Sequence, residues 1–257
     1  MIWGAAASAV IIRHDAPDAQ YRIAEQEFPP LVQLPDEGQG VLIAPRWVVT
    51  VAHAVSWRRK PIASVTINGR ARAVRRIVVH PGFQKPTGEF RGDAAPLMAW
   101  LSAQRDIALI ELAEPVADVA PALFYTGRSA RGKIAAIIGR GATGDGVTGQ
   151  SLNAPHRSAL RRAFNRIDSD QGLWLSYVFD APPRALPLEG MLGTGDSGGP
   201  VLIRQRGVWR LAGLSSWKWH HGDIDEFRSG LYGQRSFQVR IAHYRDWIDQ
   251  VIGGAAH

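Results

Sequence analysis

Short apolar runs, broken by Gly, Pro, Asn or Asp, recur along the whole of this chain. The clearest occupy residues 41–43, 47–49, 65–67, 77–79, 107–112, 134–138, 174–179, 201–203 and 209–214. Runs of this length with turn residues between them are typical of antiparallel sandwiches and barrels. No long amphipathic helices alternate with them, so a parallel sheet with crossover helices is not expected. The pattern therefore predicts an all-β protein.

One helix is expected, at residues 242–252 near the C-terminus. Apolar side chains recur there at i, i+3, i+4 and i+7, which places them on one helical face: Tyr244, Trp247, Ile248 and Val251. The glycines at 253 and 254 are expected to end this helix.

The composition is that of a folded protein with a basic surface. The chain has 257 residues, of which 46% are hydrophobic and 21% charged, enough for one large or two small cores. The net charge is +7. Specific nucleic-acid binding is one interpretation of that charge. Because the arginines are scattered rather than clustered, a generally basic surface is favoured.

The chain contains no cysteine, which excludes disulfides, a thiol nucleophile and cysteine-based zinc sites. It also lacks an apolar run of membrane-spanning length, so no membrane partner is expected. Ala7-Ser8-Ala9 fits the small-residue pattern of a signal peptidase site. We interpret residues 1–9 as the remnant of an export signal and expect a secreted or periplasmic protein, although a plain apolar terminus is the alternative.

The stretch MLGTGDSGGPVLI, residues 191–203, surrounds Ser197 with glycines. Glycine is favoured where the backbone must take a positive φ or approach another group closely. Such a turn can expose the serine hydroxyl and direct backbone N–H groups toward one point, where they would stabilise an oxyanion. An ordinary glycine-rich hairpin turn explains this stretch equally well. A base and an orienting carboxylate elsewhere in the chain would decide between the two.

His53 and Asp106 are the candidates for those two groups. His53 follows an apolar run and has small neighbours, Ala52 and Ala54, which leave room for its ring. Asp106 begins a very apolar run, where an unpaired charge would be costly and a histidine N–H would be a suitable partner. The predicted roles are Ser197 as nucleophile, His53 as general base and acid, and Asp106 as the group that fixes the histidine tautomer.

These motifs resemble those of the trypsin/chymotrypsin-like serine proteases, in a bacterial type without cysteines. TVAHAV at 50–55 is similar to the histidine motif, DIALIEL at 106–112 to the aspartate motif, and GDSGGP at 195–200 is identical to the serine motif. Their order is that of the family. AGLSSWKW at 212–219 resembles the strand beside the substrate cleft, and RIAHYRDWI at 240–248 resembles the closing helix.

The resemblance implies two six-stranded antiparallel β-barrels and a C-terminal helix. The expected segments are 10–27 packing on the second barrel, 28–116 as the first barrel, 117–120 as a connector and 121–241 as the second barrel. It also implies a serine endopeptidase that acts on proteins or peptides without a metal or organic cofactor, and we expect a monomer. A catalytically weak binding module on the same fold is the alternative.

The resemblance also implies which residues surround the substrate. The backbone N–H groups of Gly195 and Ser197 would form the oxyanion hole. The substrate-binding residues would be Met191, Leu192, Thr194, Ser216, Trp217 and Lys218. Met191 stands at the pocket-floor position, where trypsin-like enzymes carry aspartate, so no preference for Arg or Lys is expected at the cleaved residue. Small or medium apolar residues are expected there, with acidic residues as the second choice.

Asp196 has an implied structural role, because in this family the aspartate before the nucleophile pairs with a free N-terminal ammonium. We expect signal peptidase to leave Val10 as that terminus. Pairing of Asp196 with an internal group or with backbone N–H groups is the alternative.

The sequence departs from the family's pattern in three ways and contains one motif that is typical of another function. Ala54 replaces the usual cysteine of the histidine motif, the family's disulfides are absent, and residues 81–105 are longer than usual and are expected to form a lid or rim. The G-x-G-x-x-G at 139–144 could indicate nucleotide binding. Helix-breaking residues follow it, so a glycine-rich loop is preferred.

Overall fold

The computed structural model describes residues 10–58, 60–151 and 159–254. The predicted all-β fold with a C-terminal helix is confirmed. Residues 1–9, the predicted signal remnant, lie outside the described residues. None of the described helices combines the length and the apolar character needed to cross a bilayer.

The first six-stranded sheet closes into a barrel in the order β2-β3-β4-β7-β6-β5. All of its strand pairs are antiparallel. Its strands are β2 (Leu31–Gln33), β3 (Gln39–Ala44), β4 (Trp47–Thr50), β5 (Ser64–Ile67), β6 (Arg70–Val79) and β7 (Ala108–Leu112). Val32, Leu42 and Ile110 belong to the apolar cluster of this barrel.

The second six-stranded sheet is antiparallel and runs in the order β11-β8-β14-β15-β16-β12. Its edge strands β11 and β12 contact each other, but in the described residues they are not hydrogen-bonded neighbours, so this sheet is a half-barrel. Its strands are β8 (Ile134–Gly139), β11 (Arg161–Arg166), β12 (Trp174–Val178), β14 (Pro200–Gln205), β15 (Val208–Lys218) and β16 (Arg235–Arg240).

A small four-stranded sheet, in the order β10-β9-β1-β13, attaches the N-terminal segment to the second half of the molecule. Its strands are β1 (Ile11–Ile12), β9 (Gly144–Asp145), β10 (Gly149–Gln150) and β13 (Gly190–Met191). In this sheet Ile11 lies opposite Met191 in an antiparallel pair.

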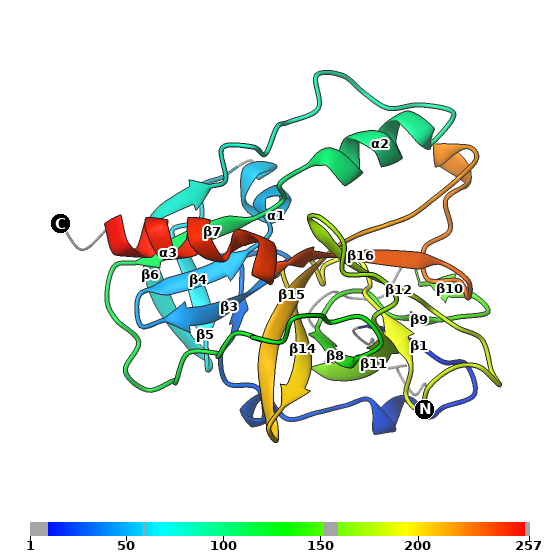
Figure 1. The fold of residues 1–257 in the computed structure, drawn as a ribbon, viewed down its shortest axis with the longest axis horizontal. Coiled ribbons are helices and arrows are strands. Elements are labelled where there is room, and N and C mark those ends of the chain that lie inside the picture. The colour runs from blue at the N-terminus through cyan, green and yellow to red at the C-terminus, as the bar shows by residue number, and fades with distance from the viewer. Residues whose placement is uncertain (1–9, 59, 152–158, 255–257) are drawn as a thin grey trace, which may run out of the picture.

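The helices lie around the two sheets (Figure 1). They are α1 (Ala52–Ser56), α2 (Ala95–Ala103) and α3 (Arg245–Gly254), with 3-10 turns η1 (Asp18–Gln20), η2 (Glu25–Glu27), η3 (Ile224–Glu226) and η4 (Ile241–Tyr244). In the C-terminal segment, Ile248 and Tyr244 are buried as expected. The helix includes Gly253 and Gly254 rather than ending before them. An exposed last turn tolerates glycine because no packing depends on it.

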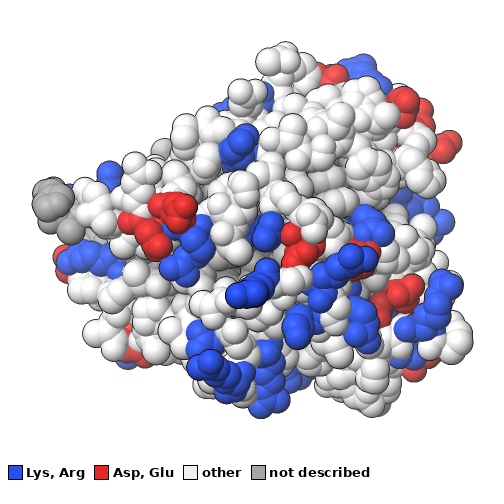
Figure 2. All heavy atoms as spheres, in the orientation of Figure 1, with Lys and Arg blue, Asp and Glu red and all other residues white. Residues whose placement is uncertain are grey.

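One apolar cluster joins both sheets to α3 and includes Trp47, Leu214 and Ile248. The two halves of the molecule are therefore packed together through this cluster, without disulfides. Figure 2 shows Lys and Arg side chains gathered over the lower part of one face, with acidic side chains among them.

Candidate active site

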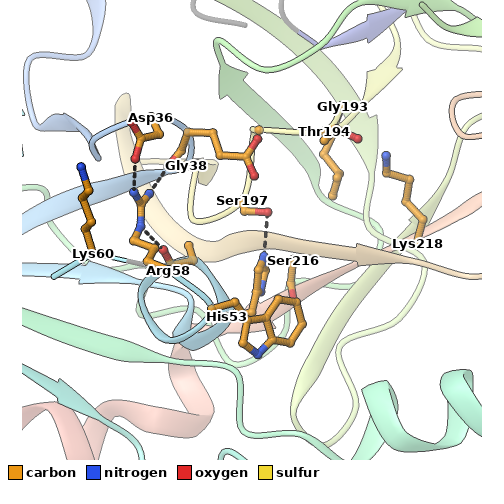
Figure 3. A pocket seen from close by; sticks show the side chains of 15 residues that line it. Asp36, Gly38, His53, Arg58, Lys60, Gly193, Thr194, Ser197, Ser216 and Lys218 are labelled. Carbon is orange, nitrogen blue, oxygen red and sulfur yellow. Dashed lines mark hydrogen bonds and ion pairs between the residues drawn. The ribbon is translucent and has the colours of Figure 1, made fainter. Parts of the chain in front are cut away.

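A cavity of about 690 Å³ lies between the two halves of the molecule (Figure 3). The first barrel supplies one wall, including His53 at the start of α1. The other wall comes from the segment 192–197 and the end of β15. The cavity is lined by Asp36, Glu37, Gly38, His53, Ala54, Trp57, Arg58, Lys60, Leu192, Gly193, Thr194, Gly195, Ser197, Ser216 and Lys218.

His53 is held by Asp106 through both its backbone and its ring. The chain leaves β4 at Thr50 and turns into the short helix α1, which brings His53 opposite Asp106, two residues before β7. The His53 backbone N–H donates to Asp106 Oδ1 at 2.8 Å, and His53 Nδ1 lies 2.7 Å from Asp106 Oδ2. Because an ionised carboxylate only accepts hydrogen bonds, Nδ1 is the protonated ring nitrogen.

The other ring nitrogen of His53 lies 2.8 Å from Ser197 Oγ. With the proton on Nδ1, Nε2 carries a lone pair that can accept the Ser197 hydroxyl proton. The three side chains predicted as a catalytic triad thus form one hydrogen-bonded chain, Asp106 to His53 to Ser197.

Asp106 is buried, and it accepts a third hydrogen bond, 2.6 Å long, from Ser216 Oγ. Burial alone would raise the pKa of Asp106, but the His53 charge and the hydrogen bonds outweigh it, so this pKa lies below its usual value. Burial likewise opposes the charged form of His53, yet the charge and hydrogen bond of Asp106 hold the His53 pKa above its usual value. The pair therefore stabilises an imidazolium at the position where a general base would acquire its proton.

The turn around Ser197 depends on glycine conformation. Gly195 has φ +89° and Gly198 has φ +79°, both in the left-handed region. A Cβ at Gly198 would lie 2.0 Å from the Gln39 carbonyl oxygen, so only glycine fits there. Among the described residues, the N–H groups of Gly195 and Ser197 have no acceptor, whereas those of Asp196, Gly198 and Gly199 are bonded. Two free donors thus lie beside the candidate nucleophile.

Asp196 is fully buried behind this turn and accepts hydrogen bonds rather than forming an ion pair within the described chain. Its donors are the backbone N–H groups of Gly141 (2.6 Å) and Gly193 (2.8 Å) and the side-chain amide of Gln39 (3.1 Å). Burial raises the pKa of Asp196, and these bonds and the Lys218 charge only partly offset it. Gly141 belongs to the G-x-G-x-x-G stretch, which forms a loop against Asp196, and the element that follows β8 is the strand β9 rather than a helix.

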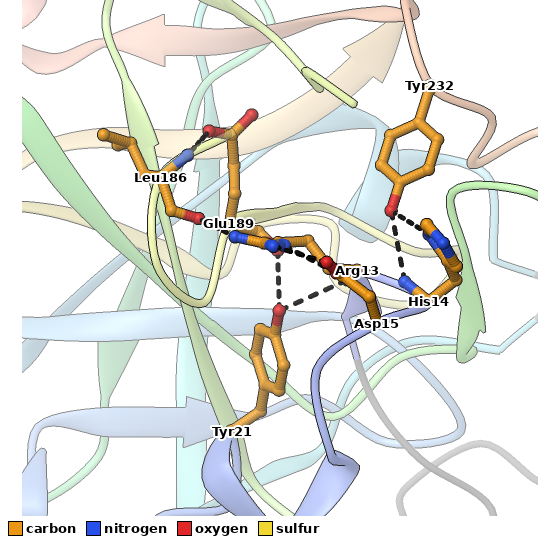
Figure 4. A network of polar contacts seen from close by, with 7 residues as sticks. All are labelled: Arg13, His14, Asp15, Tyr21, Leu186, Glu189 and Tyr232. Carbon is orange, nitrogen blue, oxygen red and sulfur yellow. Dashed lines mark hydrogen bonds and ion pairs between the residues drawn. The ribbon is translucent and has the colours of Figure 1, made fainter. Parts of the chain in front are cut away.

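Hydrogen bonds fix the N-terminal segment to the residues that precede β13 (Figure 4). Val10 is fully buried. Arg13 Nη1 donates to the Leu186 carbonyl at 2.9 Å, and the Tyr21 hydroxyl donates to the Glu189 carbonyl at 3.0 Å. These contacts join the segment to the residues just before β13.

The six predicted substrate-binding residues do not all line the same cavity. Leu192, Thr194, Ser216 and Lys218 line the main cavity. Met191 is fully buried in the apolar cluster of the second sheet and does not line that cavity.

Trp217 lines a smaller aromatic hollow of about 90 Å³ beside His53. The sequence analysis missed its remaining aromatic residues, Trp57, Phe83, Trp100 and Trp174. Phe83 and Trp100 belong to the long 81–105 segment, so its unusual length was the available signal.

Comparison with known proteins gives a family match. The family model described as Trypsin matches residues 19–248. Vitamin K-dependent protein C of Rattus norvegicus is 24% identical over 233 residues, which cover 83% of this chain and 46% of that protein. The same protein of Mus musculus is 24% identical over 241 residues, with coverages of 83% and 46%. Complement C1r-B subcomponent of Mus musculus is 25% identical over 239 residues, covering 84% of this chain and 31% of that protein. The chain thus spans less than half the length of these relatives.

Proposed function

The chain belongs to the trypsin family, and from that premise we propose that it is a serine endopeptidase with Ser197 as its nucleophile. The observation that carries the proposal is the distance of 2.8 Å between Ser197 Oγ and His53 Nε2, with His53 Nδ1 held by Asp106. A hydroxyl is a weak nucleophile unless an adjacent base takes its proton, and this arrangement supplies that base.

The proposed reaction has two halves. Ser197 Oγ attacks the peptide carbonyl carbon while His53 Nε2 takes the hydroxyl proton, and the N–H groups of Gly195 and Ser197 stabilise the oxyanion. His53 then protonates the leaving amine, the C–N bond breaks and an acyl ester remains on Ser197. Water attacks that ester, His53 takes a proton from the water, and the carboxylic acid product leaves as His53 returns the proton to Ser197 Oγ.

We propose that the enzyme does not prefer Arg or Lys at the cleaved residue. No carboxylate is available at the pocket-floor position, because Met191 stands there and is buried. The aromatic hollow beside His53 would accept apolar side chains upstream of the cleaved bond, since four tryptophans and Phe83 line it.

The proposal extends to Asp196 and the N-terminal segment. An ammonium group at Val10 would be the cation that Asp196 lacks in the described chain, because Ile11 pairs with Met191 only five residues before Asp196 in the sequence. Export to the periplasm or the medium is part of this proposal, since Ala7-Ser8-Ala9 directly precedes Val10.

Replacement of the nucleophile tests the proposal. Ser197→Ala should abolish nearly all hydrolysis of a broad peptide library, and Ser64→Ala, at the exposed start of β5, should leave hydrolysis unchanged. The cavity and fold would persist in both variants. If Ser197→Ala binds and cleaves peptides as the unaltered protein does, the assignment is wrong. Peptide binding without turnover in the unaltered protein would instead support a binding module.

A further inference from the structure

Lys218 is the charged side chain on the Ser197 side of the cavity. Lys218 is the last residue of β15. This strand pairs with β14 only as far as Leu214, and from there to Lys218 it pairs with β16 alone. Figure 3 shows Lys218 on the wall opposite Arg58 and Lys60, with Ser197 between them. The neighbouring lining residues on this wall are uncharged: Leu192, Gly193, Thr194, Gly195 and Ser216.

The ammonium of Lys218 is fixed in place by neutral groups. Its Nζ donates to Ser229 Oγ at 2.5 Å. Gln150 Oε1 accepts from the Thr194 N–H at 2.9 Å and from Thr194 Oγ1 at 3.0 Å, and Ser229 Oγ lies 3.4 Å from the same oxygen. Gln150 therefore connects the segment that carries Thr194 with the segment that carries Ser229.

Lys218 has unused binding capacity. A lysine ammonium has three donors, and among the described residues one hydrogen bond is formed and no carboxylate lies within salt-bridge distance. Burial lowers the pKa of Lys218 to about 8, and Asp196 opposes that shift through its charge. At neutral pH the group is a partly desolvated cation without an anionic partner, an arrangement that is costly unless a ligand supplies the anion.

The substrate residue whose carbonyl is attacked would lie beside this cation. Its carbonyl oxygen must approach the N–H groups of Gly195 and Ser197, which places the residue between the segment 192–195 and the end of β15. The buried Met191 does not extend the cavity further, so a side chain entering here meets Lys218.

We propose that Lys218 selects an acidic side chain, glutamate or aspartate, at the residue whose carbonyl Ser197 attacks. The proposal rests on the serine endopeptidase function given above and names its substrate class. A carboxylate would accept from Lys218 and form a charge-assisted hydrogen bond. An apolar side chain would leave the ammonium desolvated, and Arg or Lys would be repelled.

Matched peptides that differ only at the cleaved residue test this selection. With Glu, Gln, Leu and Lys at that position, we expect kcat/KM for Glu to exceed that for Gln by about tenfold or more at pH 7. Lys218→Met retains most of the aliphatic stem and should bring the Glu-to-Gln ratio close to one. Lys60→Met removes the same charge from the far end of the same cavity and should leave that ratio unchanged.

A pH series on the unaltered protein gives a second measurement that needs no variant. Asp196 is the titratable group in the described residues that acts on the Lys218 charge. Since Lys218 is charged below its pKa and a glutamate side chain is ionised above about pH 4, the Glu-to-Gln ratio should be highest between about pH 5 and about pH 8 and fall at higher pH.

Two failures have different meanings. Hydrolysis of the Gln or Leu peptide as fast as the Glu peptide would overturn the selection and leave the endopeptidase function standing. Absence of hydrolysis of every peptide, with Ser197→Ala indistinguishable from the unaltered protein, would overturn the endopeptidase function and the selection with it.

Discussion

Replacing Asp106 with Asn exchanges one buried carboxylate oxygen for an NH2 group and should prevent His53 from acting as the general base. The carboxylate accepts from His53 Nδ1, from the His53 backbone N–H and from Ser216 Oγ. An amide has one acceptor oxygen, so its NH2 group must face one of these donors. If the amide NH2 group faces His53 Nδ1, then Nδ1 must accept a hydrogen bond and the proton of the imidazole ring lies on Nε2. His53 then has no lone pair for the Ser197 proton.

Two magnitudes follow from this geometry. A wrong histidine tautomer lowers kcat by about 10⁴ in enzymes of this family. Loss of the charge-assisted hydrogen bond from His53 to Asp106, an interaction worth about 1.5–3 kcal/mol, should lower the His53 pKa. The direction follows from burial, which opposes the imidazolium and is no longer outweighed once the Asp106 charge is removed. The acidic limb of the kcat/KM profile should therefore move to lower pH.

The assay is hydrolysis of one peptide ester across a pH series, with Glu111→Gln as the control. Glu111 is also a buried acid, lies on β7 and pairs with Arg75 and Arg76, but has no hydrogen bond to His53. Glu111→Gln should destabilise the fold. In the fraction that is folded, kcat should be unchanged and the acidic limb of the kcat/KM profile should stay at the same pH. Retention of more than about a tenth of kcat by Asp106→Asn, or an acidic limb that does not move, would refute the assigned roles.

Two further changes test the turn and the N-terminus. Gly198→Ala should abolish activity and lower the melting temperature, because its Cβ would lie 2.0 Å from the Gln39 carbonyl oxygen. Gly207→Ala is the control, because Gly207 also has a positive φ, +82°, but a Cβ there would meet no atom within 4 Å. It should cost only about 1 kcal/mol of backbone strain and keep activity. Equal losses of activity in the two variants would contradict the role given to Gly198. Protein beginning at Val10 should be more active than protein that keeps residues 1–9, compared by peptide hydrolysis and intact mass; equal activity would rule out pairing of Asp196 with the Val10 ammonium.

The strand pattern and the positions of His53, Asp106 and Ser197 could be predicted because their signals are local. Short apolar runs with turn residues predict β-strands wherever they occur, and each motif is contiguous. Met191 shows where such reasoning ends. Its position before Ser197 predicts a pocket floor, but its exposure depends on the packing of β13 against Ile11, which is 180 residues earlier in the sequence.

The helix α2 and the aromatic hollow could not be predicted for a related reason. The sequence APLMAWLSA has apolar residues on all sides, and only Met98 is buried, so no helical period marks it. Trp100 lines the hollow because α2 places its ring near that of Trp57, and the centroids of these two rings are 6.4 Å apart. That contact joins two segments more than forty residues apart in the sequence.

Lys218 acts on two parts of the site, and kinetics can separate them. Its charge favours ionised Asp196, which lies behind the Gly195 and Ser197 donors, so Lys218→Met should weaken that loop and lower kcat/KM for every peptide by a common factor. The Glu-to-Gln ratio cancels the common factor and reports only the contact with the substrate. If a Val10 ammonium also pairs with Asp196, it replaces the lost charge. The common factor should then be smaller in protein that begins at Val10 than in protein that keeps residues 1–9, while the ratio falls equally in both.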